Sequence, residues 1–306
     1  MGFSSAYGPA DEAQSIRTVH RAIELGVTLF DTADVYGLGH NERLLAKALA
    51  GRRSRVLVAS KFGWTWDEQG KLVGVDGSPA HVRAACEVSL SRLGTDYLDF
   101  YYLHRLDTNT PIEDSVGAMA RLVEQGKVRY LGLCEVSAET LQRACSVYEV
   151  TVLQSEYSLW SREVEKEILP KARELGIGFV PYSPLGRGYL AGQVRTLEDL
   201  VEHDHRRSFP RFSAENLAAN RALLQVVEEI ATQRGRKPAQ VALAWVLAQG
   251  EDIVPIPGTR SFEHLEENLG TLRVELTGQE LRSLDGLASR VAGERFGPQA
   301  MRYIAR

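Results

Sequence analysis

The fold of this chain is most constrained by a regular alternation of strand-like runs and amphipathic helical segments along nearly all of its 306 residues. β-branched and aromatic residues dominate the strand-like runs, and the segments between them carry apolar residues at helical spacing. Several of these segments begin with Ser, Asp or Pro and end with Gly, as capped helices do. Such alternation favours parallel strands joined by helical crossovers. We therefore expect an α/β fold with strands at residues 28–31, 56–61, 98–103, 130–133, 152–156, 178–182 and 253–256.

No low-complexity tract or linker rich in Pro, Gly and Ser divides the chain, so we interpret residues 1–306 as a single domain. The longer loops are expected at residues 62–78 and 183–214. Long loops in a compact domain are usually functional or disordered.

The N-terminus does not fit a closed eight-strand barrel. The first periodic helix, from Asp11 to about Leu25, follows only MGFSSAYGP, where a closed barrel needs a strand. We expect the first strand to be truncated. The barrel is then open on one side, or residues 1–8 form a stub, or the chain begins late compared with longer relatives.

Composition excludes several classes of function. A net charge of -4 without blocks of like charge argues against a nucleic-acid partner. No apolar stretch is long enough to span a membrane, and no signal peptide is evident. Cys86, Cys134 and Cys145 lack CxxC spacing, which favours a reduced, cytoplasmic protein. His203 and His205 resemble part of a metal site, but no third ligand has suitable spacing, so no metal is expected.

Polar residues stand at or just beyond the ends of three expected strands. Asp31, Lys61 and His104 follow such runs, and Tyr36 lies in the loop after the first. The carboxyl ends of barrel strands are where α/β barrels carry out chemistry. A phenol has a pKa of about 10, so it needs a nearby ammonium or imidazole to act as an acid at neutral pH. Each residue alone has an ordinary explanation as a turn, packing or surface residue, but their joint placement favours a catalytic group.

A second interpretation uses two glutamates. Glu135 and Glu156 lie at the ends of neighbouring expected strands and are candidates for the acid/base pair of a barrel hydrolase or lyase. This interpretation leaves Tyr36 and Lys61 without a role.

Six motifs, in order, resemble those of the aldo-keto reductases: FDTADVYG, SKFG, YYLHR, QSEYSLW, VPYSPLGRG and IPGTRSFEHLEENLG. The resemblance runs from Ala6 to about Leu287 and is greatest to the perakine-reductase-like and pyridoxal-reductase-like branch. It implies a (β/α)8 TIM-type barrel that binds NADPH without a Rossmann fingerprint. The sequence has neither G-x-G-x-x-G after a strand nor a phosphate-binding GK[ST] motif.

The resemblance also implies an activity, the NADPH-dependent reduction of an aldehyde or ketone to the alcohol by hydride transfer from nicotinamide C4. The tetrad falls on Asp31, Tyr36, Lys61 and His104. Tyr36 donates the proton, Lys61 favours the resulting phenolate, Asp31 keeps Lys61 charged, and His104 donates a hydrogen bond to the carbonyl oxygen. Within the same family, an NADPH-binding sensor or regulatory subunit with slow turnover is the alternative.

Cofactor contacts are expected in three groups. Cys134, Glu135 and Gln154 are placed at the nicotinamide carboxamide, and Tyr182 stacks on the nicotinamide ring. A loop of small residues and the start of a late helix are placed at the phosphates and the adenine, with Arg260 at the 2′-phosphate. A solvated turn for Arg260 and plain helix surface for Glu267 are the alternatives. The other expected contacts in the loop are Ser183, Leu185, Gly186, Arg187 and Gly188, and those at the start of the helix are Gly258, Thr259, His264, Glu267 and Asn268.

Loop aromatics are candidates for the substrate pocket, namely Trp64, Trp160 and Phe209. Core packing beneath the loops is an equally good explanation for them.

Overall fold

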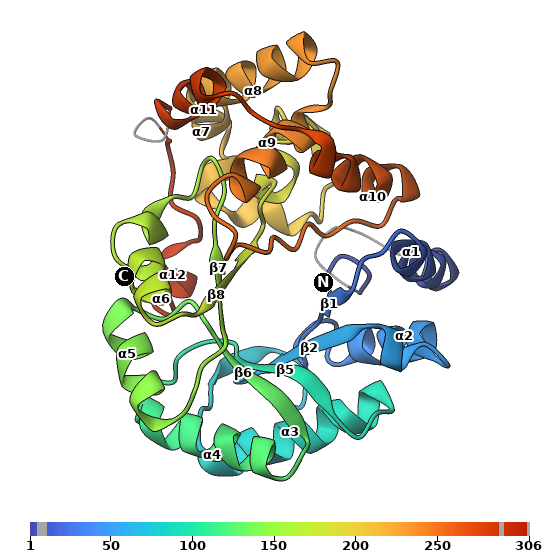
Figure 1. The fold of residues 1–306 in the computed structure, drawn as a ribbon, viewed down its shortest axis with the longest axis vertical. Helices are drawn as coiled ribbons and strands as arrows, with labels where there is room; N and C mark the ends of the chain where they lie inside the picture. The colour runs from blue at the N-terminus through green and yellow to red at the C-terminus, as the bar shows by residue number, and fades with distance from the viewer. Residues whose placement is uncertain (5–10, 288–290, 305–306) are drawn as a thin grey trace.

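The centre of the computed structural model, which describes residues 1–4, 11–287 and 291–304, is a curved parallel sheet (Figure 1). Its strand order is β1-β2-β5-β6-β7-β8. Parallel neighbours bring the carboxyl ends of these strands to the same edge of the sheet. The strands are β1 (Leu29–Asp31), β2 (Leu57–Phe62), β5 (Leu98–Leu103), β6 (Val128–Cys134), β7 (Val152–Glu156) and β8 (Gly178–Tyr182).

The expected strand at residues 253–256 continues this sheet beyond β8. A parallel bridge joins Phe179 to Ile253, and the Val254 N–H donates to the Phe179 carbonyl at 2.9 Å. The Ile256 N–H donates to the Pro181 carbonyl at 3.1 Å. The segment therefore pairs with β8, although the pairing is too short for a regular strand.

Helices cover the outer side of the curved sheet (Figure 1). Their starts follow the expected capping chemistry: Asp11 accepts from the Gln14 N–H at 2.9 Å, and Ser137 accepts from the Thr140 N–H at 3.2 Å. Parallel strands surrounded by crossover helices form the expected (β/α)8-type barrel arrangement. The covering helices are α1 (Glu12–Glu24), α2 (His40–Leu49), α3 (Pro79–Leu93), α4 (Ile112–Glu124), α5 (Ala138–Val147) and α6 (Ile168–Glu174).

The last third of the chain adds further helices, shown in yellow to red in Figure 1. Trp245 of the buried helix α9 (Pro238–Leu247) is fully enclosed, and its indole N–H donates to Asp285 at 3.0 Å. No helix in the described part of the chain is long and apolar enough to cross a membrane. These helices are α7 (Ala214–Ala219), α8 (Arg221–Gln233), α9 (Pro238–Leu247), α10 (Phe262–Leu269), α11 (Gly278–Asp285) and α12 (Pro298–Met301).

The expectation of a loop over residues 62–78 is wrong for two short segments. β3 (Trp64–Trp66) and β4 (Leu72–Val75) form an antiparallel hairpin apart from the barrel sheet. Its turn is closed by Asp67, whose carboxylate accepts from the Lys71 N–H at 2.8 Å. Strands this short carry little periodicity, so the Gly-rich and polar turn residues dominate the sequence pattern.

The expected truncation of the first strand concerns residues 1–10, of which 5–10 lie outside the described residues. Residues 1–4 form a turn, in which the Ser4 N–H donates to the Met1 carbonyl at 3.0 Å.

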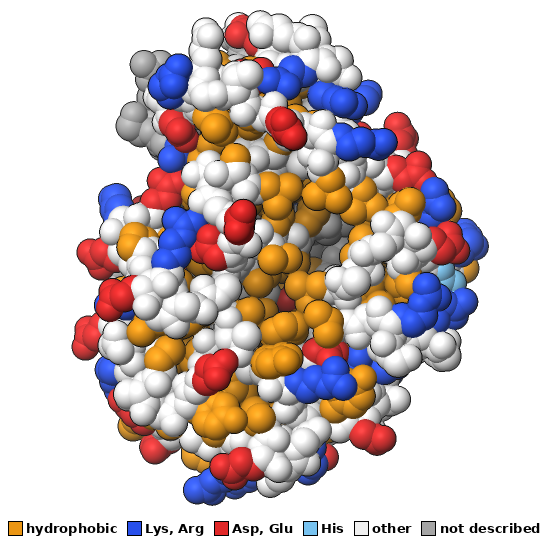
Figure 2. Space-filling view, in the orientation of Figure 1, with side chains coloured by type: hydrophobic (Ala, Val, Ile, Leu, Met, Phe, Trp, Pro, Cys, Tyr) orange, Lys and Arg blue, Asp and Glu red, His pale blue; other side chains and the backbone are white. Residues whose placement is uncertain are grey.

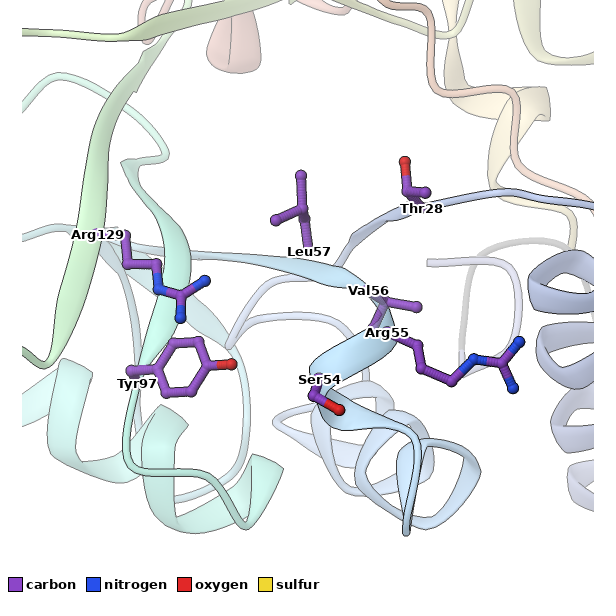
Figure 3. A pocket seen from close by; sticks show the side chains of 7 residues that line it. All are labelled: Thr28, Ser54, Arg55, Val56, Leu57, Tyr97 and Arg129. Carbon is purple, nitrogen blue, oxygen red and sulfur yellow. The ribbon is translucent and has the colours of Figure 1, made fainter.

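A pocket of about 380 Å³, whose lining residues are shown in Figure 3, lies at the amino ends of the strands. Arg53 and Arg129 lie over the Tyr97 ring, each 4.2 Å from its centroid, and both donate to the buried Asp99. This network stabilises the strand starts. The lining residues are Thr28, Ser54, Arg55, Val56, Leu57, Tyr97 and Arg129.

Candidate active site

Lys61 and Asp31 form a buried ion pair at the carboxyl ends of β1 and β2. The Lys61 ammonium donates to the Asp31 carboxylate and, at 2.8 Å, to the Thr32 carbonyl. Parallel pairing of β1 with β2 aligns Asp31 with Ala59. Lys61 lies two residues further along β2 and therefore points to the same face as Ala59. Burial alone would lower the pKa of Lys61, but Asp31 and Tyr36 outweigh it and raise that pKa above its ordinary value. The site therefore holds a permanent cation.

Tyr36 lies over this cation. The Lys61 ammonium is 5.2 Å from the centroid of the Tyr36 ring. The Tyr36 ring meets His104 edge-on, with centroids 5.9 Å apart and planes at 82°. Burial raises the pKa of Tyr36, whereas Lys61 lowers it, and the net direction is upward. Tyr36 is therefore a protonated phenol at neutral pH, next to a charge that stabilises its conjugate base.

His104 follows β5 and is 8% exposed. Its backbone N–H donates to the Phe62 carbonyl at 2.8 Å, which fixes the residue to the end of β2. Burial lowers the pKa of His104 well below its ordinary value, and Arg105 and Lys61 lower it further. The imidazole is therefore neutral, and its Nδ1 is buried without a hydrogen-bond partner. The structure thus brings together all four residues of the expected tetrad.

Two further side chains lie next to the ion pair. Gln154 of β7 donates from Nε2 to Asp31 at 2.8 Å, so one expected carboxamide contact also orients the ion pair. Tyr102 of β5 is buried, with its ring centroid 6.0 Å from the Lys61 ammonium. Sequence reasoning missed Tyr102. The available signal was its position two residues before His104, because alternate residues of a strand point to the same face.

The loop after β8 has unusual backbone geometry. Ser183, Gly186, Arg187 and Gly188 all have positive φ, at 50°, 56°, 56° and 98°. Non-glycine residues in this region are strained and concentrate at functional sites. The Gly186 N–H closes a turn on the Ser183 carbonyl at 2.9 Å, and the Gly188 N–H closes one on Leu185 at 3.1 Å. In this conformation those two amides are engaged within the loop.

Tyr182, at the end of β8, has a buried hydroxyl without a hydrogen-bond partner. Burial raises its pKa well above the ordinary value, so it is a neutral phenol. Cys134 ends β6, next to the buried Tyr102 and Ala59, and burial raises the pKa of its thiol to about 12. The expected nicotinamide contacts therefore lie on three adjacent strand ends.

Glu156 belongs to a buried charge cluster. Arg187 donates to both carboxylate oxygens of Glu156, at 2.9 and 2.8 Å, and Arg211 and Arg295 lie at 3.9 and 4.0 Å. Burial would raise the pKa of Glu156, but these guanidinium groups lower it to about 2. Glu156 is therefore a fixed carboxylate and a poor proton donor.

Glu135 belongs to the same cluster. It accepts from Arg295 at 3.1 and 3.3 Å and from the Glu156 backbone N–H at 2.9 Å. The two glutamates thus serve as counter-ions rather than as the acid/base pair of a hydrolase. Sequence reasoning missed Arg211 and Arg295, because neither follows a strand nor belongs to a local motif.

The start of helix α10 gathers the third group of expected cofactor contacts. Ser261 caps the helix by accepting from the His264 N–H at 3.3 Å, and Thr259 accepts from the Ser261 N–H at 3.1 Å. Gly258 is exposed, and a Cβ atom placed on it would have open space around it to at least 4 Å. Further along α10, Asn268 is buried and Glu267 is half-buried. The Arg260 carbonyl accepts from Gln14 at 3.2 Å, which anchors this turn to α1.

The three candidate pocket aromatics have different surroundings. Trp64 lies 6.4 Å from the His104 ring and packs on Tyr303 at 5.1 Å. Phe209 is half-buried and packs on Phe296 at 5.4 Å. Trp160 is instead enclosed in the core, stacked on Tyr189 at 4.3 Å. Its side chain is 1% exposed.

Asp34, in the loop before Tyr36, is a buried carboxyl with one oxygen that has no hydrogen-bond partner. Glu42, Arg92 and Lys61 are the charged groups that act on it. Burial raises the pKa of Asp34 to about 8, and the nearby Glu42 adds to the shift. The folded protein therefore holds a proton on Asp34 that the unfolded chain releases near pH 4.

The raised pKa of Asp34 predicts that the free energy of unfolding decreases as pH rises. Because the folded pKa is the higher one, the contribution of Asp34 is fully present below about pH 4 and is lost as pH rises to about 8. Asp34→Asn should remove up to about 1.4 kcal/mol per pH unit of that slope. Urea denaturation at a series of pH values measures it, with Glu24→Gln on the exposed face of α1 as the control. Parallel pH profiles for the wild type and Asp34→Asn would contradict the prediction.

Comparison with known proteins identifies one family. The model of the Aldo/keto reductase family matches residues 1–289. A probable aldo-keto reductase from Glycine max is 46% identical over 286 residues, which cover 93% of this chain and 82% of that protein.

Solved structures show the same similarity. A glycerol dehydrogenase from Gluconobacter oxydans superposes with a TM-score of 0.86 at 30% identity, covering 96% of this chain and 91% of that one. An aldo/keto reductase from Klebsiella pneumoniae, in complex with NADP and acetate, has a TM-score of 0.73 at 29% identity and covers 96% and 92% of the two chains. The chain therefore belongs to the aldo/keto reductase family of oxidoreductases.

Proposed function

We propose that this chain catalyses the NADPH-dependent reduction of an aldehyde or ketone to the corresponding alcohol. The observation that carries the proposal is the buried Lys61–Asp31 pair, 5.2 Å beneath the ring of a protonated Tyr36 and next to a neutral His104. Membership of the aldo/keto reductase family supports it, as do two solved structures of aldo-keto reductase from Klebsiella pneumoniae, one in complex with NADP and one with NADPH. The cofactor supplies the hydride that reaches the carbonyl carbon.

The side chains supply the proton and position the carbonyl group. Tyr36 donates its hydroxyl proton to the oxygen that becomes the alcohol, and the Lys61 ammonium stabilises the phenolate left behind. Asp31 holds Lys61 in place and is itself oriented by Gln154. The single N–H of a neutral His104 donates to the carbonyl oxygen and so positions it near the Tyr36 hydroxyl.

The residues present fit a nicotinamide dinucleotide. The unpartnered hydroxyl of Tyr182 and the amide of Gln154 lie at adjacent strand ends, with Cys134 and Glu135 beside them. An apolar ring and polar groups at one place suit the nicotinamide face and its carboxamide. The Ser183–Gly188 loop would follow the pyrophosphate, and the start of α10 would receive the 2′-phosphate and the adenine. That loop must release the turns that now engage Gly186 and Gly188.

Arg260 provides a test of cofactor choice. If its guanidinium pairs with the 2′-phosphate, Arg260→Ala should weaken NADPH binding by about 10- to 100-fold, because a charge-assisted contact contributes roughly 1.5 to 3 kcal/mol. The affinity for NADH, which lacks this phosphate, should stay nearly unchanged. Fluorescence titration with both cofactors measures the two affinities. Equal losses for NADPH and NADH would remove Arg260 from this role.

The proposed function is tested by titrating the purified protein with NADPH and then following NADPH oxidation against a panel of aldehydes and ketones. We expect saturable binding and turnover of the order of 1 per second or faster on at least one carbonyl compound. Tight binding without turnover across the panel would favour an NADPH-binding sensor instead. No binding of NADPH or NADH would reject both.

We also propose that residues 1–306 form one domain. One hydrophobic cluster extends from Val19 in α1 to Leu287, just beyond α11, and includes residues of every barrel strand except β1. A single core of this extent is typical of one folding unit.

A further inference from the structure

A cation that the proton transfer does not use lies next to His104. Arg105 follows directly in the chain and is half-buried. Its guanidinium donates to the His104 carbonyl at 2.6 Å and lies 5.8 Å from the centroid of the Trp64 ring. Trp64 in turn meets the His104 ring edge-on. Arg105 therefore belongs to the side of the site where His104 would hold the carbonyl oxygen.

Arg105 differs from the neighbouring guanidinium groups, because no carboxylate of the described residues is bonded to it. Arg187 is held by Glu156, and Arg295 by Glu135. Burial would lower the pKa of Arg105, but Tyr182 and Glu135 raise it, so the group stays charged. Glu135 is already occupied by Arg295 and by the Glu156 backbone N–H.

A guanidinium has five N–H donors in a planar fork, and a carboxylate matches that fork with two parallel hydrogen bonds. One nitrogen of the Arg105 guanidinium donates to the His104 carbonyl, and the other two nitrogens can donate to a ligand. The flat ring of Trp64 beside it suits the carbon skeleton that would join a carbonyl group to an acid.

We propose that Arg105 binds a carboxylate of the substrate, so that this enzyme reduces oxo acids, carbonyl compounds that carry an acid group at a distance from the reacting carbon. The proposal rests on the proposed carbonyl reduction. Hydride and proton still add across the C=O bond, and the carboxylate of the substrate is unchanged in the product. Arg105 sets which carbonyl compound is accepted and takes no part in the proton transfer.

Matched pairs of substrates test this proposal. For 3- and 4-formylbenzoate, kcat/KM should exceed that of the methyl esters by about 10- to 100-fold for at least one isomer, the range typical of a charge-assisted contact. In Arg105→Leu the ratio of kcat/KM for the acid to kcat/KM for its ester should fall to about 1. Arg105→Lys should retain part of it, since it keeps the charge but loses the fork. Arg143→Leu, which removes an exposed cation paired with Glu113, should leave the preference intact.

Terephthalate provides a readout that does not depend on turnover. It carries the carboxylates without an aldehyde and should quench tryptophan fluorescence of the wild type in the presence of NADP+, with a Kd at least about tenfold lower than for Arg105→Leu. Equal binding by the two proteins, or an unchanged preference for the acids in Arg105→Leu, would overturn the proposal. So would an Arg105→Leu protein whose main loss is in NADPH affinity, because Arg105 would then hold a cofactor phosphate. Arg105-dependent terephthalate binding without turnover of any aldehyde would uphold the carboxylate site and reject the proposed function.

Discussion

Tyr36→Phe should reduce kcat by about 10²- to 10⁴-fold, the usual contribution of general acid catalysis, while leaving NADPH binding close to that of the wild type. The substitution removes only the hydroxyl. The ring keeps its place 5.2 Å from the Lys61 ammonium and its edge-on contact with His104. Stopped-flow measurement of single-turnover NADPH oxidation separates the chemical step from product release.

Tyr101→Phe is the matched control for this experiment. Tyr101 is also a buried tyrosine, but it stacks on Phe62 and its hydroxyl makes only a long 3.4 Å hydrogen bond to the Val82 carbonyl. Its variant should fold and turn over like the wild type. If Tyr36→Phe keeps near wild-type turnover on an unactivated aldehyde, Tyr36 is not the proton donor.

The pH profile provides a second check on the role of Tyr36. Because burial raises the pKa of Tyr36, the phenol stays protonated across the neutral range. The rate of carbonyl reduction should therefore be flat from slightly acidic to slightly alkaline pH and fall only where the phenol ionises. A decline of the rate near pH 7 that follows a single ionisation would point to another acid.

Much of the fold could be predicted from the sequence, because the strand signal is local. β-branched and aromatic runs mark β2, β5, β7 and β8 to within about one residue, since these strands are buried on both faces. The same strands deliver Lys61, His104 and Gln154 to one edge of the sheet. Any chain with this alternation places its strand-end residues together, so the grouping of Asp31, Lys61 and His104 could be predicted from this pattern alone.

The parts that could not be predicted depend on contacts between distant segments. Arg295 reaches Glu135 from 160 positions away, and Tyr303 reaches Trp64 from the far end of the chain. Neither partner has a local pattern that announces its role. Trp160 could not be assigned from the sequence for the same reason. A tryptophan in a loop motif can line a pocket or pack in the core, and only its contact with Tyr189 shows that it lies in the core.

The charge cluster around Glu156 was also outside the reach of sequence reasoning, yet it has large consequences for stability. Three guanidinium groups surround one fully buried carboxylate. Taking so many charges out of water is costly, and only their mutual attraction offsets that cost. The cluster joins the end of β7 to the loop after β8 and to the segment around Arg295.

Glu156→Gln should therefore lower the free energy of unfolding by about 3–5 kcal/mol, the usual cost of removing one partner from a buried ion pair. Gln has nearly the same shape but no charge and only one acceptor oxygen, so Arg187 loses its counter-ion and one of its two hydrogen-bond acceptors. Because the folded pKa of Glu156 is about 2 against an ordinary 4.5, the contribution of its charge is complete above about pH 4.5 and is lost as pH falls towards 2. The difference between the two proteins should shrink accordingly in acid. Urea denaturation at pH 7 and pH 3 measures it. Glu113→Gln, which breaks only the exposed pair with Arg143, should cause little change at either pH. A Glu156→Gln protein as stable as the wild type at pH 7 would show that the cluster does not hold these segments together. A stable variant that has lost reductase activity would instead show that Glu156 is needed for catalysis rather than for stability.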